Sequence, residues 1–251
     1  MKKNLYHLYQ SNVPVANLKV LLFDLDGTLY PASAIENKIG PTFFGHAKKV
    51  FQLDAEQTYE TIQQYRKEFH HVIFGLKKYY GIDPDTFYAD VFESLDISAA
   101  EPYNGLIDIL HECSKYYKLA LWTNSSRGHA KRLLEKFSCL NLFSYIFSLE
   151  DFNYYKKPNR EGFEMCLEKL KESPKNVLFF DDSYLNLKTA KIIGLNTVLV
   201  SNHIVEPPYF WEMHRKEKHF PQSFVDYNTH NLTEMLEFIL NERKLCQHGT
   251  N

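Results

Sequence analysis

Cysteine is scarce in this chain of 251 residues and forms no closely spaced pair. The four cysteines lie far apart, and no Cys-x-x-Cys motif occurs (Cys113, Cys139, Cys166 and Cys246). Zinc sites are typically marked by such pairs, and disulfide frameworks by regularly spaced cysteines in short secreted chains. The sequence therefore predicts buried or incidental thiols in a reducing compartment.

Long apolar runs and a dominant charge are also lacking. No window approaches the ~20 apolar residues of a membrane-spanning helix. The N-terminal segment MKKNLYHLYQSNVPVANLK has no apolar stretch of the kind found in signal peptides. The net charge is −2, with lysine and arginine spread along the chain, so we expect neither a nucleic acid polymer nor a membrane as partner. These absences predict a cytoplasmic protein and leave its oligomeric state open.

Apolar residues nevertheless make up 44% of the chain, enough for a substantial core. They form short, continuous runs at residues 20–23, 119–122, 145–149, 177–180 and 197–200. Such runs are typical of strands buried on both faces of a parallel sheet. Helical patterns alternate with them, at residues 127–137, 160–171 and 184–193. This alternation predicts an α/β fold with a doubly wound parallel sheet.

One interval breaks this alternation. Between residues 31 and 101 no buried strand is expected, and helical patterns follow one another at residues 56–70, 71–80 and 84–93. The interval is too long for a single crossover connection. We therefore expect an all-helical insert at residues 31–101 and a discontinuous core domain formed by residues 18–30 and 102–245.

The C-terminal part carries weaker signals. Residues 223–227 are a candidate last strand, and residues 232–240 a candidate closing helix. The stretch from Pro207 to Pro221 is rich in proline, aromatic and basic residues. We expect it to be irregular, and favour a packing role over the docking of a partner.

The first apolar run leads into two acids, in the stretch LLFDLDGTLY. Asp24 and Asp26 are two positions apart at the end of a strand, so their side chains project to the same side. Ligands bind outside the carboxyl ends of parallel strands. Gly27 permits a sharp turn there, and Thr28 offers a hydroxyl. An ordinary turn after a strand would explain a lone Asp-x-Asp-Gly equally well.

Three further polar signals follow other predicted strands or precede helices. LALWTNSS places Thr123 and Asn124 where a helix N-terminus could bind phosphate, although an ordinary N-cap looks the same. YYKKPNREGF places Lys157 before a helix, where a lone lysine is usually a surface residue. VLFFDDSYLN ends a buried strand on Asp181 and Asp182, adjacent acids that need a cation or many hydrogen-bond donors.

Taken together, these four motifs resemble those of the haloacid dehalogenase (HAD) superfamily, over about residues 18–200. The resemblance implies a Rossmann-like core with the helical insert as a cap of the C1 type. It implies that Asp24 is the nucleophile, which forms an aspartyl-phosphate, and that Asp26 is the general acid–base. Thr123 and Lys157 would hold the phosphoryl oxygens and, with Asn124, bind substrate.

The resemblance also implies a Mg²⁺ cofactor. Its ligands would be Asp24, the backbone carbonyl of Asp26, and the pair Asp181 and Asp182. Asp182 is the first choice for a direct ligand, with Asp181 bound directly or through water. A dication and a lysine among these carboxylates would explain why they tolerate one another.

The second acid favours phosphomonoester hydrolysis, because dehalogenases of the superfamily lack an acid–base at the position of Asp26. A phosphonate hydrolase would need a cap lysine, but lysines on helices are usually solvated. A phosphomutase would have to bind a bisphosphate intermediate, and the insert shows no convincing basic pair other than Arg66 and Lys67. A phosphate-sensing protein without activity has no need of Asp26.

The substrate is less sharply indicated. FDLDGTLYP, the Trp-Thr-Asn form of the second motif and FFDDS resemble the pyrimidine 5′-nucleotidase-like branch. The insert departs from that branch at residues 71–74, which read His-Val-Ile-Phe. Possible substrates are therefore a nucleotide or another small phosphomonoester, or a phosphorylated aromatic group such as phosphotyrosine. Arg66 in the insert is a candidate substrate-binding residue.

Overall fold

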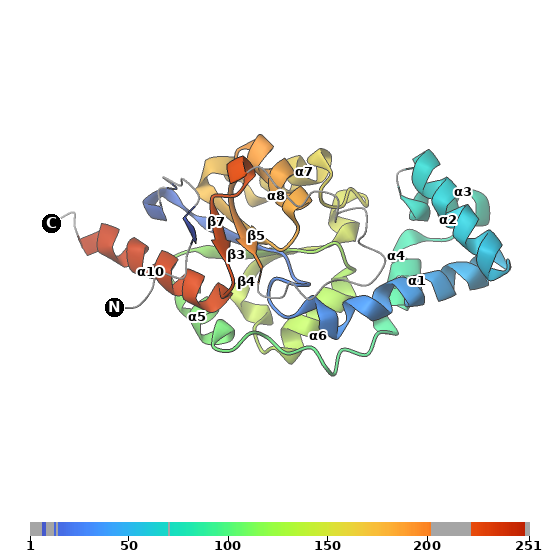
Figure 1. Ribbon diagram of the computed structural model, residues 1–251, viewed down its shortest axis with the longest axis horizontal. Helices are drawn as coiled ribbons and strands as arrows, with labels where there is room; N and C mark the ends of the chain where they lie inside the picture. The colour runs from blue at the N-terminus through green and yellow to red at the C-terminus, as the bar shows by residue number, and fades with distance from the viewer. Residues whose placement is uncertain (1–6, 9–12, 14, 70, 202–221, 249–251) are drawn as a thin grey trace. The chain divides into compact units, whose positions relative to one another are not determined.

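The computed structural model describes residues 7–8, 13, 15–69, 71–201 and 222–248 (Figure 1). The stretch from Pro207 to Pro221 lies outside the described residues. Among the residues described, no helix combines the length and the apolar character needed to cross a membrane. The chain divides into two compact units. The core unit comprises Met1–Ser33 and Ala100–Asn251, and the helical unit comprises Ala34–Ala99.

A seven-stranded sheet lies at the centre of the core unit, in the order β1-β7-β6-β5-β2-β3-β4. Every neighbouring pair is parallel except β1 and β7, which are antiparallel. The strands are β1 His7–Leu8, β2 Val20–Phe23, β3 Lys118–Trp122, β4 Phe143–Phe147, β5 Val177–Asp181, β6 Asn196–Val200 and β7 Tyr227–Thr229. The predicted α/β fold with a parallel sheet is confirmed.

Helices cover both faces of this sheet. Figure 1 shows α7 and α8 on one face and α5, α6 and α10 on the other. β2 and β5 are buried along their whole length, which explains why their sequences are continuously apolar. The helices are α5 Leu106–Ser114, α6 Arg127–Lys136, α7 Arg160–Leu170, α8 Tyr184–Ile193 and α10 Leu232–His248.

An aromatic cluster fixes α7 to the sheet. Trp122 at the end of β3 meets Phe163 of α7 edge-on, with the ring centroids 4.6 Å apart. Phe163 also meets Phe179 of β5, at 5.6 Å. Edge-to-face pairs of this kind are stabilising and geometrically specific. Because α7 follows the loop that carries Lys157, this packing determines where that loop leaves the core.

The expected last strand at residues 223–227 is wrong by several positions. Gln222–Phe224 forms a 3-10 helix, and β7 begins only at Tyr227. The carboxylate of Asp226 accepts hydrogen bonds from Lys191 Nζ (2.6 Å) and from the backbone N–H of Thr197 (2.9 Å). A buried side chain therefore ties down the segment just before β7. The two-residue strand β1 was not predicted, and the closing helix α10 extends beyond the predicted residues 232–240.

Four helices make up the helical unit: α1 Glu36–Phe51, α2 Ala55–Phe69, α3 Val72–Tyr80 and α4 Pro84–Glu93. Of these, α1 was not predicted individually. Asp83 caps α4 by accepting a hydrogen bond from the N–H of Thr86 (2.9 Å), and Pro84 occupies the first turn. His71 caps α3 and its Nε2 lies 3.2 Å from the hydroxyl of Tyr88, so this histidine has a packing role.

The contact between α2 and α3 depends on Gly75. A methyl group at this position would overlap the ring of Tyr65 on α2. We expect Gly75→Ala to lower the free energy of unfolding by about 1–3 kcal/mol, the usual cost of overpacking. Gly45 on α1 is the matched control, because a methyl group there meets nothing within 4 Å. Gly45→Ala should be neutral or stabilising by ~0.5–1 kcal/mol. Urea denaturation followed by circular dichroism measures both, and equal effects would contradict the assignment.

Candidate active site

Three parallel strands bring the polar motifs of the core unit to one edge of the sheet. Phe23 of β2 pairs with Leu121 of β3 and with Phe180 of β5. Asp24 follows directly, and its backbone N–H donates to the carbonyl of Phe180 (2.9 Å). The register therefore places Asp24 beside the end of β3, which leads into Thr123, and beside Asp181 at the end of β5.

A buried lysine joins two of the acids. Lys157 is 2% exposed, and its Nζ lies 2.6 Å from Asp24 Oδ1 and 2.8 Å from Asp181 Oδ2. Burial alone would lower the pKa of Lys157, but the charges of Asp181 and Asp24 outweigh burial and raise the pKa. Lys157 is therefore a cation at neutral pH and offsets part of the charge of the carboxylates.

Asn124 holds the backbone of this lysine. Its Oδ1 accepts from the N–H of Lys157 (2.9 Å), and its Nδ2 donates to the Lys157 carbonyl (3.0 Å). Both functional groups of the amide are thus engaged with the lysine loop. We predicted Asn124 as a substrate-binding residue, and that role remains a prediction. What the structure shows is that its side chain positions Lys157.

Asp181 and Asp182 lie in different environments. Asp181 is fully buried and accepts hydrogen bonds from Lys157 Nζ, from the N–H of Ser183 (2.8 Å) and from Asn186 Nδ2 (2.9 Å). Asp182 is exposed. Its carboxylate lies against Gly27, where a side chain would collide with the carboxylate. Gly27 also has a φ of +85°, a conformation that favours glycine. The sequence analysis did not identify Asn186.

Three of these acids form a possible metal site. Asp24, Asp181 and Asp182 each offer one carboxylate oxygen, and the three oxygens lie within 4.8 Å of one another. Hard oxygen ligands of this kind suit Mg²⁺. The side chains present therefore fit the divalent cation that the sequence motifs imply. The part expected of the Asp26 carbonyl remains a prediction.

The carboxylate of Asp26 stands apart from this cluster. Its Oδ1 accepts a hydrogen bond from the hydroxyl of Tyr30, and the Nε2 of His129 lies 3.8 Å from the same oxygen. Its Oδ2 faces the hydroxyl of Thr123, at 3.3 Å. The sequence analysis missed Tyr30 and His129. The spacing of Tyr30, four residues after Asp26, was the only available signal.

The two acids of the first motif differ in proton affinity. Burial raises the pKa of Asp24 to about 7; Lys157 opposes this shift, while Asp181 and Asp26 add to it. Burial also favours the neutral form of Asp26, but the nearby His129 ring and the Tyr30 hydroxyl lower its pKa. Environments that separate the pKa values of two neighbouring acids are typical of active sites.

The structure thus brings together the core residues predicted for the site, namely Asp24, Asp26, Thr123, Asn124, Lys157, Asp181 and Asp182. Arg66, predicted to bind substrate, belongs to α2 of the helical unit, where its side chain is exposed.

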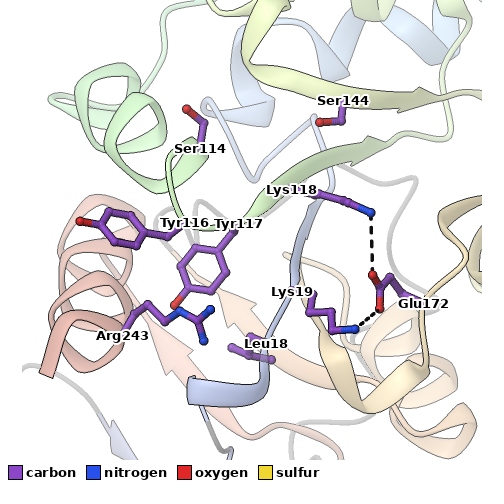
Figure 2. Close-up of a pocket in the computed structure, with 9 residues that line it drawn as sticks. All are labelled: Leu18, Lys19, Ser114, Tyr116, Tyr117, Lys118, Ser144, Glu172 and Arg243. Carbon is purple, nitrogen blue, oxygen red and sulfur yellow. Dashed lines mark ion pairs between the residues drawn. The ribbon is translucent and has the colours of Figure 1, made fainter. Parts of the chain in front are cut away.

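A depression of about 410 Å³ lies elsewhere in the core unit (Figure 2). Lys19 precedes β2 and Lys118 begins β3, and both pair with Glu172, at 3.4 and 3.8 Å. Tyr117 and Arg243 also line it. It therefore lies at the amino ends of these strands, the opposite edge of the sheet from Asp24. It plays no part in the acid cluster.

The parallel sheet carries acids, a lysine and a hydroxyl at its carboxyl edge, the edge where α/β enzymes bind their ligands. Residues 21–200 match the haloacid dehalogenase-like hydrolase family, and the chain belongs to this family.

Two curated relatives are similar in sequence. Phosphate metabolism protein 8 of Saccharomyces cerevisiae is 27% identical over 75% of this chain and 62% of its own length. The chain therefore spans less than two thirds of that relative. Validoxylamine A 7′-phosphate phosphatase of Streptomyces hygroscopicus is 24% identical over 75% of this chain and 88% of its own length.

Solved structures of the family share the fold. A HAD phosphatase from Thermococcus onnurineus superposes with a TM-score of 0.57 at 16% identity, covering 88% of this chain and 98% of that chain. The magnesium-bound HAD-hydrolase YfnB from Bacillus subtilis gives 0.56 at 20% identity, with 89% and 99% covered. L-2-haloacid dehalogenase from Xanthobacter autotrophicus gives 0.52 at 15% identity, with 88% and 98% covered.

The raised pKa of Asp24 predicts a pH dependence of stability. In the metal-free protein the folded state keeps a proton on Asp24 up to about pH 7, whereas the ordinary pKa of an aspartate side chain is 3.8. The stability that this proton gives to the folded state is fully present below pH 3.8 and is lost as the pH rises through about 7. Because Asn does not titrate, Asp24→Asn avoids this loss. In chelator, the free energy of unfolding of Asp24→Asn relative to that of wild type should therefore increase by about 2 kcal/mol between pH 5.5 and 8. Urea denaturation at both pH values measures this gain, and parallel pH profiles would contradict the assignment.

Proposed function

We propose that this hydrolase is a Mg²⁺-dependent phosphomonoester phosphatase that works through an aspartyl-phosphate on Asp24. One observation carries the proposal. The Asp26 carboxylate stands outside the acid cluster and faces the hydroxyl of Thr123 at 3.3 Å. A carboxylate in this place can move protons at the leaving oxygen. Dehalogenation has no basic leaving oxygen to protonate.

The residues divide the chemistry among them. A carboxylate oxygen of Asp24 attacks phosphorus and the ester P–O bond breaks, while Asp26 gives its proton to the leaving oxygen. Asp26 then takes a proton from the water that attacks the aspartyl-phosphate, which releases inorganic phosphate and restores Asp24. Lys157 and Thr123 hold the phosphoryl oxygens and stabilise their charge.

Two proton affinities constrain this scheme. The lowered pKa of Asp26 makes it a base in the resting protein. It must therefore gain its proton when substrate binds, because the negative phosphoryl group beside it raises the pKa of the carboxyl group. Asp24 must instead lose a proton to act as the nucleophile, since its pKa of about 7 leaves much of it neutral at physiological pH. Mg²⁺ held by Asp24, Asp181 and Asp182 would favour the ionised nucleophile and offset phosphoryl charge.

The substrate class that we propose is a small phosphomonoester, with a pyrimidine nucleotide as the first candidate. The relative named as a phosphatase of validoxylamine A 7′-phosphate supports a small phosphate ester in general. Aryl phosphates remain the alternative. The aromatic residues of α4 give little support to an aryl phosphate as the substrate, because Phe87, Tyr88 and Phe92 are buried and pack within the helical unit.

We further propose that the helical unit serves as a C1-type cap that selects the organic part of the substrate. The core residues would grip only the phosphoryl group, which leaves recognition of the rest to another part of the chain. Arg66 on α2 is our candidate contact. A screen of nucleotides, sugar phosphates and phosphopeptides, with and without Mg²⁺, tests the reaction and the substrate class together.

The nucleophile provides the first test. Asp24→Asn should lower phosphatase activity by roughly 10³-fold or more, because an amide cannot form the aspartyl-phosphate. The fold should be retained, as judged by circular dichroism. Gly45→Ala, in the helical unit, serves as a purification control. Turnover of p-nitrophenyl phosphate by Asp24→Asn at near the wild-type rate would refute the mechanism.

The metal site provides the second test. Both oxygens of Asp181 already accept hydrogen bonds from protein groups, whereas Asp182 is exposed. Asp182→Asn should therefore raise the Mg²⁺ concentration for half-maximal activity by at least about tenfold, with little change in stability in chelator. Asp181→Asn should mainly lower stability, because it removes a buried partner of Lys157. Mg²⁺ binding by calorimetry provides an independent readout, and the reverse order of effects would show that the ligand assignment is wrong.

A further inference from the structure

The two oxygens of the Asp26 carboxylate have different partners. Oδ1 accepts a hydrogen bond from Tyr30 and faces His129, and Oδ2 faces Thr123. We propose that Tyr30 and His129 are positioning residues that anchor Oδ1, and that Oδ2 is the oxygen that carries the catalytic proton. This assignment rests on the proposed phosphatase reaction.

Tyr30 is built into the turn that carries the acids. The N–H of Gly27 donates to the carbonyl of Tyr30 (3.1 Å), which closes the turn between Asp26 and Tyr30. The Tyr30 side chain is fully buried, and its ring lies 5.7 Å from that of Phe137, just after α6. The ring therefore has little freedom, and its hydroxyl is fixed on Oδ1.

His129 approaches Oδ1 from a second element. It lies in the first turn of α6, where Ser126 Oγ accepts a hydrogen bond from its backbone N–H (3.3 Å), and its side chain is fully buried. Its Nε2 is 3.8 Å from Asp26 Oδ1, longer than a hydrogen bond. Catalytic contacts are often long without substrate and shorten in the complex.

The same segment, from the end of β3 into α6, thus supplies Thr123 to one oxygen and His129 to the other. Thr123 is fixed in turn by Ser125, whose Oγ lies 2.7 Å from its hydroxyl. The Tyr30 hydroxyl bonded to Oδ1 and the His129 ring beside it restrict rotation of the carboxylate and keep Oδ2 on the side of the residue proposed to bind phosphate. Small misplacement of a proton-transfer group can cost a large part of its effect.

The experiment compares two substrates that differ in their need for an acid. The leaving group of p-nitrophenyl phosphate is weakly basic, whereas that of glycerol 2-phosphate is a strongly basic alkoxide. General acid catalysis matters most for the basic leaving group. Values of kcat/KM report only the steps up to the first irreversible one, so slow hydrolysis of the aspartyl-phosphate does not confuse the comparison.

We expect Tyr30→Phe and His129→Leu to lower kcat/KM for glycerol 2-phosphate at least about tenfold more than for p-nitrophenyl phosphate. Asp26→Asn sets the upper limit of this selective loss. His129→Gln should recover part of it, because its side-chain amide can donate from near the position of Nε2. Tyr117→Phe is the matched control: Tyr117 is 4% exposed, lines the depression at the opposite edge of the sheet, and should leave both rates unchanged (Figure 2).

The outcomes separate the two proposals. If wild type hydrolyses neither substrate, the proposed function and this assignment both fail. If wild type and Asp26→Asn behave as expected but Tyr30→Phe and His129→Leu lower both substrates by the same factor, the two residues are merely structural. If His129→Leu does not fold, Tyr30→Phe decides the matter, and a wild-type ratio of the two rates for this variant would overturn the positioning role.

Discussion

The buried ammonium of Lys157, held between Asp24 and Asp181, is the interaction on which the site depends. Moving these charges out of water is costly, and their attraction repays the cost only if the geometry is good and the remaining groups are hydrogen-bonded. The structure meets both conditions. Asp24 and Lys157 are 133 positions apart in the chain yet lie 2.6 Å apart, and Asn124 holds the lysine backbone with both groups of its amide. The loss of Lys157 would leave buried carboxylate charge in the core without its cation.

The same arrangement gives the two acids of the first motif different environments. Asp24 lies among the charges at the ends of β2 and β5, and its raised pKa reflects burial and crowding by other carboxylates. Asp26 lies two residues further on, after the strand has ended, where the hydroxyls of Tyr30 and Thr123 donate to its carboxylate and the His129 ring lies 3.8 Å away. One short turn therefore gives two neighbouring acids different surroundings and opposite shifts in pKa.

Sequence reasoning could identify the acids and the hydroxyl because parallel strands place their carboxyl ends at one edge of a sheet, whereas Lys157, which precedes a helix, was identified by the resemblance of its motif. A residue that follows a buried strand is thus located by local sequence alone. Tyr30, His129 and Asn186 escaped that reasoning, since each acts through a contact with a specific atom in another part of the fold. Asn124 shows the same limit: its position was predicted, but only the structure shows that its amide binds the lysine loop. The shift of β7 has a similar cause, because the buried Asp226 decides where that strand begins.

The fold itself does not select the reaction. A phosphatase and a dehalogenase of the family superpose on this chain with TM-scores of 0.57 and 0.52, both at low identity. What separates the two chemistries is whether a proton can be delivered to a leaving oxygen, and this depends on one carboxylate and its neighbours. The surroundings of Asp26 therefore hold more information about function than the whole sheet does. The organic part of the substrate is a separate problem: if the core site binds only a phosphoryl group, as we propose, its selectivity cannot extend beyond that group.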